Sequence, residues 1–266
     1  MEREKVVISI DTDFFCRELP EWDFGHSEKS GLFATDIIWN TRYSYLPLHK
    51  EMNIKFADCT PKGLFERFKA VGLKIDKNTL IAAGWSHSFA YEVFRHFNFD
   101  WLYNFDAHHD CWDAGKEVDC ANWVTKLGAY KRKQKPPSRL QYAWMFPKWL
   151  DTSLFGELPD EGIYPVSLPS FEKLDFLKNK EVVAIYIAQS PAWVAPHCDI
   201  IFHELVKEAQ IATGKKAVDS DYSFVSRRGM TEVEARQALI MHKREMAKLK
   251  IKAMGEKIRN ERAKNE

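Results

Sequence analysis

The sequence WLYNFDAHHDC occupies residues 101–111 and changes character abruptly at its middle. Its first five residues are apolar or aromatic apart from one asparagine, as in a strand that is buried on both faces of a sheet. Two acids and two histidines follow between Asp106 and Asp110. Polar groups at the end of a buried strand are unfavourable unless they are hydrogen-bonded or neutralised. The stretch therefore predicts a strand whose carboxyl end carries either a polar turn or part of a metal site.

Four other apolar runs predict further buried strands of the same kind. They are rich in β-branched and aromatic residues, and each ends in polar residues. Segments with helical periodicity lie between some of them, at 61–72, 88–97 and 199–213. Strands that alternate with helices predict a three-layer, doubly wound α/β fold with a mostly parallel sheet. The four runs are VVISI at 6–10, TLIAAG at 79–84, LQYAWMF at 140–146 and VVAIYI at 182–187.

The chain divides into a predicted α/β domain at residues 1–228 and a predicted basic amphipathic helix at 229–266. Thr231 can cap this helix, and Glu234 can reach back to complete a capping box. From Thr231 onward the sequence has ten Lys and Arg against six Glu, with apolar residues at roughly helical spacing. Such a helix packs on its own domain, self-associates or binds a protein partner, and binding to nucleic acid is the less favoured alternative.

The composition argues against several classes of protein. The 39 basic and 38 acidic residues nearly cancel, so no global charge indicates nucleic acid or a membrane as partner. The N-terminal apolar run has five residues, which is too short for a signal peptide or a membrane span, so we expect a cytoplasmic protein. The five cysteines form no CxxC pair and are odd in number, which indicates reduced thiols.

The polar part of residues 101–111 has the spacing of a metal-binding motif. If the chain remains extended there, side chains two positions apart project to the same side, so Asp106, His108 and Asp110 converge. His109 then faces away from the metal, which favours packing or a supporting contact over direct catalysis. Carboxylate and imidazole together suit Mn²⁺, Fe²⁺ or Zn²⁺, and the excess of carboxylate favours Mn²⁺.

Two other places in the chain can supply the remaining ligands. Asp11 and Asp13 follow the predicted strand at 6–10, and His87 lies on the turn between the strand at 79–84 and the next helix. Two acids at the end of a buried strand need a positive charge nearby, and a metal ion supplies it directly. Because the carboxyl ends of parallel strands share one edge of a sheet, these groups are expected to meet there.

Together the three places resemble the arginase and deacetylase superfamily. Its ureohydrolase branch binds two Mn²⁺ ions through a Gly-Gly-Asp-His-Ser motif, a DAHxD motif and an SxDxD motif. AGWSHS at 83–88, FDAHHD at 105–110 and SIDTD at 9–13 match these motifs in turn. Within the superfamily, SIDTDFF followed downstream by CANW and AQSPAW is most similar to an uncharacterised family related to peptide arginases. The resemblance implies an arginase-like fold and a metal-dependent hydrolase.

The resemblance also implies a mechanism and a ligand set. Asp11 and Asp106 would bridge two Mn²⁺ ions, and a hydroxide that bridges the ions would attack the guanidinium carbon. Arginine, chiefly in a peptide, would then give ornithine and urea, and Asp110 would orient the hydroxide. Zn²⁺, Fe²⁺ and Co²⁺ share these ligands with Mn²⁺. The six implied ligands are Asp11, Asp13, His87, Asp106, His108 and Asp110.

The sequence departs from the family pattern at points that concern the substrate. The SxDxD motif comes first in this chain, which implies a circular permutation or a different strand order. Val124 stands where arginases carry a histidine that transfers protons, so His109 becomes a candidate for that role. Motifs that bind the α-amino and α-carboxylate groups of free arginine are not evident. We therefore expect an arginine-containing peptide or a small guanidino compound as substrate.

Five residues near the predicted carboxyl edge are candidates for substrate contact, although aromatic residues in such loops equally serve as anchors. Two alternatives to the guanidino hydrolase remain open. An amide deacetylase of the same superfamily needs one Zn²⁺, held by an Asp-x-His pair and a later Asp. A non-catalytic metal-binding protein would keep the fold and bind a partner through the C-terminal helix. The five candidates are Trp112, Asn122, Trp123, Ser190 and Trp193.

Overall fold

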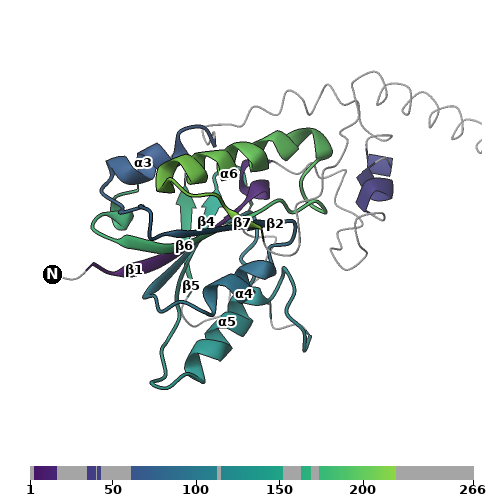
Figure 1. Cartoon of the computed structure of the whole chain (residues 1–266). Coiled ribbons are helices and arrows are strands. Elements are labelled where there is room, and N and C mark those ends of the chain that lie inside the picture. The colour runs from purple at the N-terminus through teal and green to yellow at the C-terminus, as the bar shows by residue number, and fades with distance from the viewer. Residues whose placement is uncertain are drawn as a thin grey trace, which may run out of the picture.

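A computed structural model of the chain contains a seven-stranded sheet with helices on both faces (Figure 1). Every pair of neighbouring strands is parallel. This confirms the predicted three-layer α/β architecture, while its likeness to arginases stays a prediction. The predicted C-terminal helix at 229–266 and the domain boundary after residue 228 lie outside the described residues. The structure describes residues 3–16, 35–39, 41–42, 61–112, 115–151, 163–168 and 174–219.

The strand order of the sheet is β5-β4-β3-β1-β6-β2-β7, so the first strand of the chain lies at its centre. Strands β6, β2 and β7 lie on one side of β1, and strands β3, β4 and β5 lie on the other side. After β2 the chain therefore crosses β1 to form β3, β4 and β5. Ligand sites of open α/β sheets lie at such a switch point, beyond the carboxyl ends of the strands. The strands are β1 (Lys5–Asp11), β2 (Leu80–Gly84), β3 (Trp101–Phe105), β4 (Gln141–Pro147), β5 (Ile163–Leu168), β6 (Glu181–Ala188) and β7 (Val218–Asp219).

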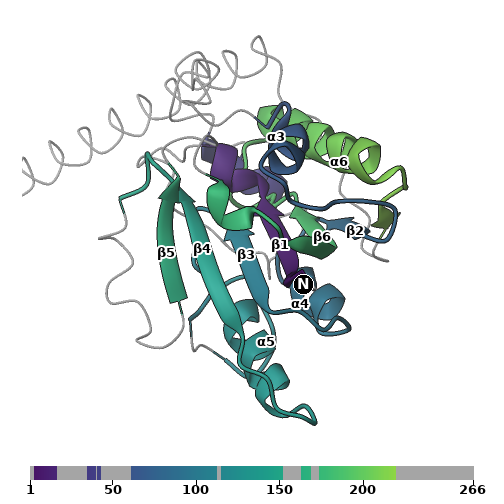
Figure 2. The same cartoon turned by 90° about the vertical axis from the view of Figure 1, so that its left-hand side faces the viewer.

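Two helices cover each face of the sheet (Figures 1 and 2). On one face, α3 (Leu64–Ala70) packs against α6 (Asp199–Thr213), and on the other α4 (Phe89–Phe94) packs against α5 (Trp123–Arg132). Short 3₁₀ turns form at η1 (Thr12–Phe15), η5 (Asp175–Leu177) and η6 (Pro196–Cys198), and residues 35–39 and 41–42 are helical. No helix among the described residues combines the length and the apolar character that crossing a membrane requires.

Each face of the sheet has its own apolar core. Beneath α3 and α6, Phe68 packs against Phe65 and against Phe105 of β3, with ring centroids 5.7 and 5.5 Å apart. Beneath α4 and α5, Phe94 lies 6.1 Å from Trp123, and both side chains are fully buried. Strands β1, β2, β3, β4 and β6 are buried along most of their length, which explains the continuous apolar runs of these strands.

The strand register brings three loops together at the carboxyl edge. Ile10 of β1 is paired with Phe105 of β3, while Ala188 of β6 is paired with both Asp11 and Gly84. The chain therefore leaves β1, β3, β6 and β2 at nearly the same level. Beyond the strands, the Ser190 N–H still donates to the Trp85 carbonyl at 2.9 Å. Loops from distant parts of the sequence thus lie side by side at this edge.

The five strands and three of the helices expected from the sequence are confirmed, whereas α5, β5 and β7 were not predicted. The buried face of α5 includes Gly128 and Lys131, neither of which contributes to an apolar periodic pattern. In β5, Pro165 cannot donate a ladder hydrogen bond, and proline in a run argues against a strand. The strand forms because β5 lies at the edge of the sheet, where one side needs no partner strand.

We expect Phe68→Ala to lower the free energy of unfolding by about 3–5 kcal/mol, because it leaves a cavity between α3 and β3. Ile211→Ala is the control: the side chain of Ile211 is 71% exposed on α6, so its loss should change stability by less than about 0.5 kcal/mol. Urea unfolding followed by circular dichroism measures both. Equal effects of the two substitutions would contradict the described core.

Candidate metal centre

The six predicted ligands all lie at the carboxyl edge of the sheet. Asp11 is the last residue of β1, Asp13 follows in η1, and His87 lies on the turn between β2 and α4. The turn after β3 carries the other three, on the strand next to β1. The edge therefore collects ligands from β1, β2 and β3 at the switch point of the sheet. The three residues from the β3 turn are Asp106, His108 and Asp110.

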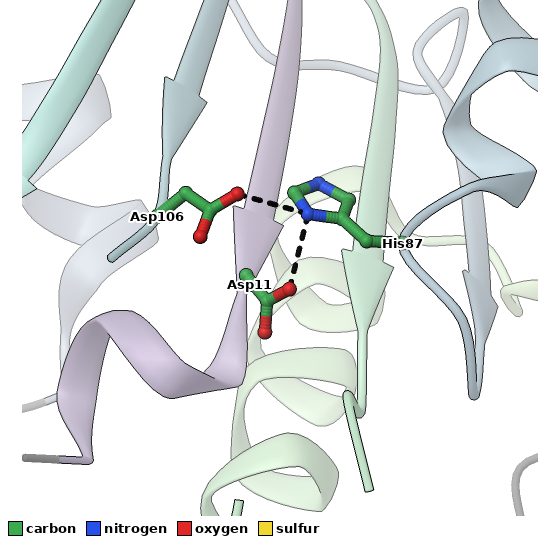
Figure 3. A group of neighbouring side chains, drawn as sticks. All are labelled: Asp11, His87 and Asp106. Carbon is green, nitrogen blue, oxygen red and sulfur yellow. Dashed lines mark ion pairs between the residues drawn. The ribbon is translucent and has the colours of Figure 1, made fainter. Parts of the chain in front are cut away.

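The imidazole of His87 is surrounded by three carboxylates. Its Nδ1 atom lies 3.0 Å from an Oδ2 atom of each of Asp11, Asp106 and Asp110. Figure 3 shows the ring pointing between Asp11 and Asp106. A single ring nitrogen carries at most one hydrogen, so it cannot donate to three oxygens at once. Convergence of three carboxylate oxygens and one imidazole nitrogen is the arrangement that a bound cation requires.

A second group forms around His108. Its Nδ1 atom lies 2.9 Å from Asp13 Oδ2 and 3.6 Å from Asp106 Oδ1. The donor atoms of Asp13, Asp106 and His108 lie within 4.8 Å of one another, as do those of Asp11, His87 and Asp106. Asp106 belongs to both groups and directs a different oxygen to each histidine. It is therefore placed as a carboxylate that can bridge two ions.

Asp11 occupies a different position from Asp106. Its Oδ2 atom faces His87 at 3.0 Å and accepts from the Ser190 hydroxyl at 2.5 Å. Its Oδ1 atom accepts from the backbone N–H of Asp13 at 3.1 Å and so caps η1. The structure thus places Asp11 in the group around His87 and Asp106 and not in the group around His108, and its predicted role as a second bridge stays a prediction.

Hydrogen bonds from neighbouring side chains hold the ligands in place. Ser9 Oγ lies 2.6 Å from His87 Nε2, which leaves Nδ1 to face the carboxylates. Trp123 Nε1 donates to Asp110 Oδ2 at 2.6 Å, and Asn104 Nδ2 donates to Asp106 Oδ2 at 3.0 Å. The sequence analysis assigned no role to Ser9 or Asn104. Each is a polar residue inside an otherwise apolar strand, two positions before an aspartate, and this was the available signal.

The prediction that side-chain alternation along an extended strand brings Asp106, His108 and Asp110 together was wrong. Strand β3 ends at Phe105, so side-chain alternation along an extended chain does not apply to the residues after it. A turn forms instead, in which the His108 N–H donates to Asp106 Oδ1 at 2.7 Å. Asp110 has a φ of 54°, in the left-handed region that asparagine and aspartate tolerate better than most residues. This turn brings Asp110 to His87.

Burial and mutual repulsion govern the protonation of the cluster. Burial and the neighbouring charges of Asp11 and Asp106 raise the pKa of Asp13 well above its ordinary value. Burial and the charge of Asp106 similarly raise the pKa of Asp110. Burial also opposes ionisation of Asp106, yet His87 and His108 hold its pKa well below the ordinary value. Without a cation, then, the carboxylates of the site do not all ionise readily together.

The surrounding carboxylates raise the pKa values of the two imidazoles, those of His87 and His108. Burial alone would lower the pKa of both histidines, but Asp106 and Asp11 raise the pKa of His87 well above its ordinary value. Asp106 and Asp13 do the same for His108. The histidines therefore hold protons in the positions where a metal ion would bind, and an ion must displace these protons.

His109 follows His108 in the sequence, but its side chain belongs to neither of the two groups of potential ligands. It is 2% exposed, and its Nδ1 atom accepts from the Cys111 N–H at 3.0 Å. The ring centroid lies 5.1 Å from Trp112 and 5.6 Å from Trp144. Burial lowers the pKa of His109, which favours the neutral ring. Its predicted role in proton transfer stays a prediction.

The five predicted substrate contacts differ in how far their side chains are exposed to solvent. Asn122 and Trp123 are fully buried; the Asn122 amide donates to the Glu117 carbonyl at 3.0 Å, and Trp123 supports Asp110. Ser190 is 1% exposed and bonded to Asp11. Trp112 is 48% exposed, and Trp193 is partly exposed with its ring centroid 4.5 Å from His108. Direct substrate contact stays a prediction for all five.

The donor set fits a hard or borderline divalent ion. Both groups consist of carboxylate oxygen and imidazole nitrogen, and neither includes a thiolate. Such ligands suit Mn²⁺, Fe²⁺, Co²⁺ and Zn²⁺, and a majority of carboxylates favours Mn²⁺. The residues are thus able to hold a metal, while the identity of the ion and the number of ions per chain stay predictions.

Comparisons with protein-family models, with curated proteins and with solved structures found no match for this chain. The resemblance to ureohydrolases therefore rests on the three sequence motifs and stays a prediction.

We expect the metal-free protein to lose stability as the pH rises from about 5 to about 8. Asp13, Asp110, His87 and His108 have raised pKa values, so above their ordinary values the folded state binds more protons than the unfolded state. Their stabilising protonation is lost as the pH rises through the folded-state values. The pKa of Asp106 is lowered, so its contribution is lost only at acid pH.

Urea unfolding in EDTA across this pH range measures the effect. Saturating Mn²⁺ should reverse the trend, since the ion binds the deprotonated ligands. A metal-free stability that increases toward pH 8 would contradict the described electrostatics.

The hydrogen bond from Trp123 to Asp110 should contribute to metal binding. Trp123→Phe should weaken Mn²⁺ binding by about 10- to 100-fold, because the indole N–H that orients the carboxylate is lost. Trp101→Phe is the matched control, since Trp101 begins β3 at the opposite end of the strand and stacks on Tyr103. Calorimetric titration with Mn²⁺ compares them, and unchanged affinity in Trp123→Phe would remove the supporting role.

Proposed function

We propose that this chain is a metal-dependent hydrolase with two metal ions, which cleaves the guanidino group of an arginine-containing peptide or a small guanidino compound. The observation that carries the proposal is the position of Asp106. One of its oxygens faces His87 at 3.0 Å, and the other lies 3.6 Å from the ring of His108. A carboxylate shared by two imidazole groups is the arrangement of a site that holds two ions side by side.

The protein's own residues would divide the work of the reaction. When bound, the ions would supply Lewis-acid activation of a water molecule and of the guanidinium carbon. Ser9 and Trp123 keep His87 and Asp110 in fixed orientations through bonds of 2.6 Å. Asp110, next to Asp106 in the site, can accept a proton from the attacking water, which its raised pKa favours. The leaving amine must be protonated as it departs; His109 is the predicted residue for this transfer, although its lowered pKa favours the neutral ring and its Nδ1 atom accepts from the Cys111 N–H.

The charge and depth of the site suit a guanidinium group. Four carboxylates balance the charge of two divalent ions, so the loaded site would carry no net positive charge from them to repel a guanidinium. Asp11, Asp13, Asp106 and Asp110 are at most 4% exposed, whereas the His108 side chain is 27% exposed. A ligand therefore reaches the carboxylates on the His108 side. A thin, planar, cationic group at the end of a long side chain has the shape for such an approach.

Two alternatives make different demands on these residues. An amide deacetylase would use a single Zn²⁺, and the His87 group would then have no assigned function. A non-catalytic metal protein is favoured by one observation, the hydrogen bond that commits His109 Nδ1 to the Cys111 backbone. Metal content and turnover separate the three possibilities.

The test is incubation of the protein with Mn²⁺ and a panel of substrates: arginine, agmatine, an arginine-containing peptide and an acetyl-lysine peptide. Mass spectrometry should show conversion of arginine to ornithine in the peptide, and metal analysis should show about two Mn²⁺ per chain. Asp106→Asn should reduce urea formation to background, since it removes the shared charge. Asp175→Asn removes the same charge at an exposed position in η5 and should retain activity.

Loss of acetyl groups together with one tightly bound Zn²⁺ would favour the deacetylase. Metal binding without conversion of any compound in the panel would favour the non-catalytic protein and overturn the proposed hydrolase.

A further inference from the structure

The exposure of the ligands indicates the route by which a substrate enters the site. His87 and the four aspartates are buried, while the side chain of His108 is 27% exposed. The indole of Trp193 lies against His108, with ring centroids 4.5 Å apart and ring planes inclined by 51°. Trp193 is itself partly exposed. A molecule that approaches the carboxylates past His108 must therefore pass next to this indole.

The turn that carries Trp193 is fixed directly to the metal centre. The Trp193 N–H donates to the Ser190 carbonyl at 2.9 Å, and the Ser190 hydroxyl donates to Asp11 Oδ2 at 2.5 Å. Ser190 has a φ of 49°, which few non-glycine residues adopt. Its N–H is bound by the Trp85 carbonyl at 2.9 Å, which compensates for the unusual conformation. The position of the indole is thus determined by the same contacts that position a ligand.

A second set of contacts holds the turn from the other side. Trp39 Nε1 donates to the Pro191 carbonyl at 2.7 Å, and Arg42 Nη1 donates to the Ala192 carbonyl at 2.9 Å. The Arg42 guanidinium also lies over the Trp39 ring, 4.4 Å from its centroid. Both of these side chains are buried. Because the carbonyls of Pro191 and Ala192 are bound, the backbone that leads into Trp193 is held in place before a substrate arrives, which reduces the entropy lost on binding.

We propose that Trp193 determines specificity by stacking on the planar cation of the substrate, a guanidinium or amidinium, at the entrance of the site. This inference rests on the proposed function, because it assigns a residue to recognition of that substrate class. The face of an indole is the best aromatic surface for a cation, and a delocalised planar cation can lie flat on it. A neutral isostere with the same shape lacks this attraction.

A purely structural role for Trp193 would give different results. If the indole only held the His108 ring, its loss would weaken metal binding and would affect charged and neutral ligands equally. If the indole only supplied an apolar surface, leucine would replace it without loss of ligand affinity. Cation recognition instead predicts a loss that is confined to charged ligands.

The test uses benzamidinium and its neutral isostere benzamide as probes, titrated calorimetrically into the Mn²⁺-loaded full chain. Trp193→Phe should bind benzamidinium within about threefold of the unchanged protein, and Trp193→Leu should bind it about tenfold more weakly. Affinity for benzamide should be low and similar in all three proteins. Mn²⁺ affinity should be the same in all three.

Equal benzamidinium affinity in Trp193→Leu and the unchanged protein would overturn the proposal, and so would a parallel loss of benzamide or Mn²⁺ binding. The titration requires no turnover, so it is independent of the proposed hydrolysis. If urea is released but Trp193→Leu binds benzamidinium as tightly as the unchanged protein, the hydrolase proposal stands and the stacking role is overturned. If Trp193→Leu binds only benzamidinium more weakly but no urea is released, the recognition role stands and the proposed reaction is overturned.

Discussion

Repulsion among four buried aspartates is the constraint on which the functional site depends. Asp11, Asp13, Asp106 and Asp110 are each at most 4% exposed and converge around two histidines. In the low dielectric of an interior, like charges at this separation are strongly unfavourable unless opposite charge and hydrogen bonds compensate them. Burial, followed by this repulsion, raises the pKa values of Asp13 and Asp110. A bound cation would offset this repulsion, and the two groups of side chains could hold one.

The sheet supplies the geometry that keeps these charges together. Parallel strands end at one edge, and the central position of β1 between β3 and β6 brings Asp11 next to the turn after Phe105. Apolar cores on both faces fix the strands, so the carboxylates cannot separate without loss of packing. Side-chain donors within the strands, at Ser9 and Asn104, then orient individual ligands. The packing of the core therefore holds the potential metal ligands together.

Aromatic residues form the next layer around the ligands. Trp123 donates to Asp110 from the buried side, while Trp193 lies against His108 on the more exposed side. The same residue type thus serves two purposes, support from within and a surface toward an incoming molecule. Sequence patterns could place both tryptophans near the carboxyl edge, but only burial separates their roles: Trp123 is 0% exposed and Trp193 is partly exposed.

The sequence by itself determined the buried strands, most of the helices and the identity of the side chains at the carboxyl edge, because burial on both faces produces continuous apolar runs that end where polar chemistry begins. It could not predict β5, whose Pro165 is tolerated only at the edge of a sheet, or the turn that directs Asp110 toward His87. It also could not show that Asp106 is shared by both histidine groups. Those features were decided by the tertiary structure, since they depend on which strands become neighbours and on the register between them, and local sequence carries neither.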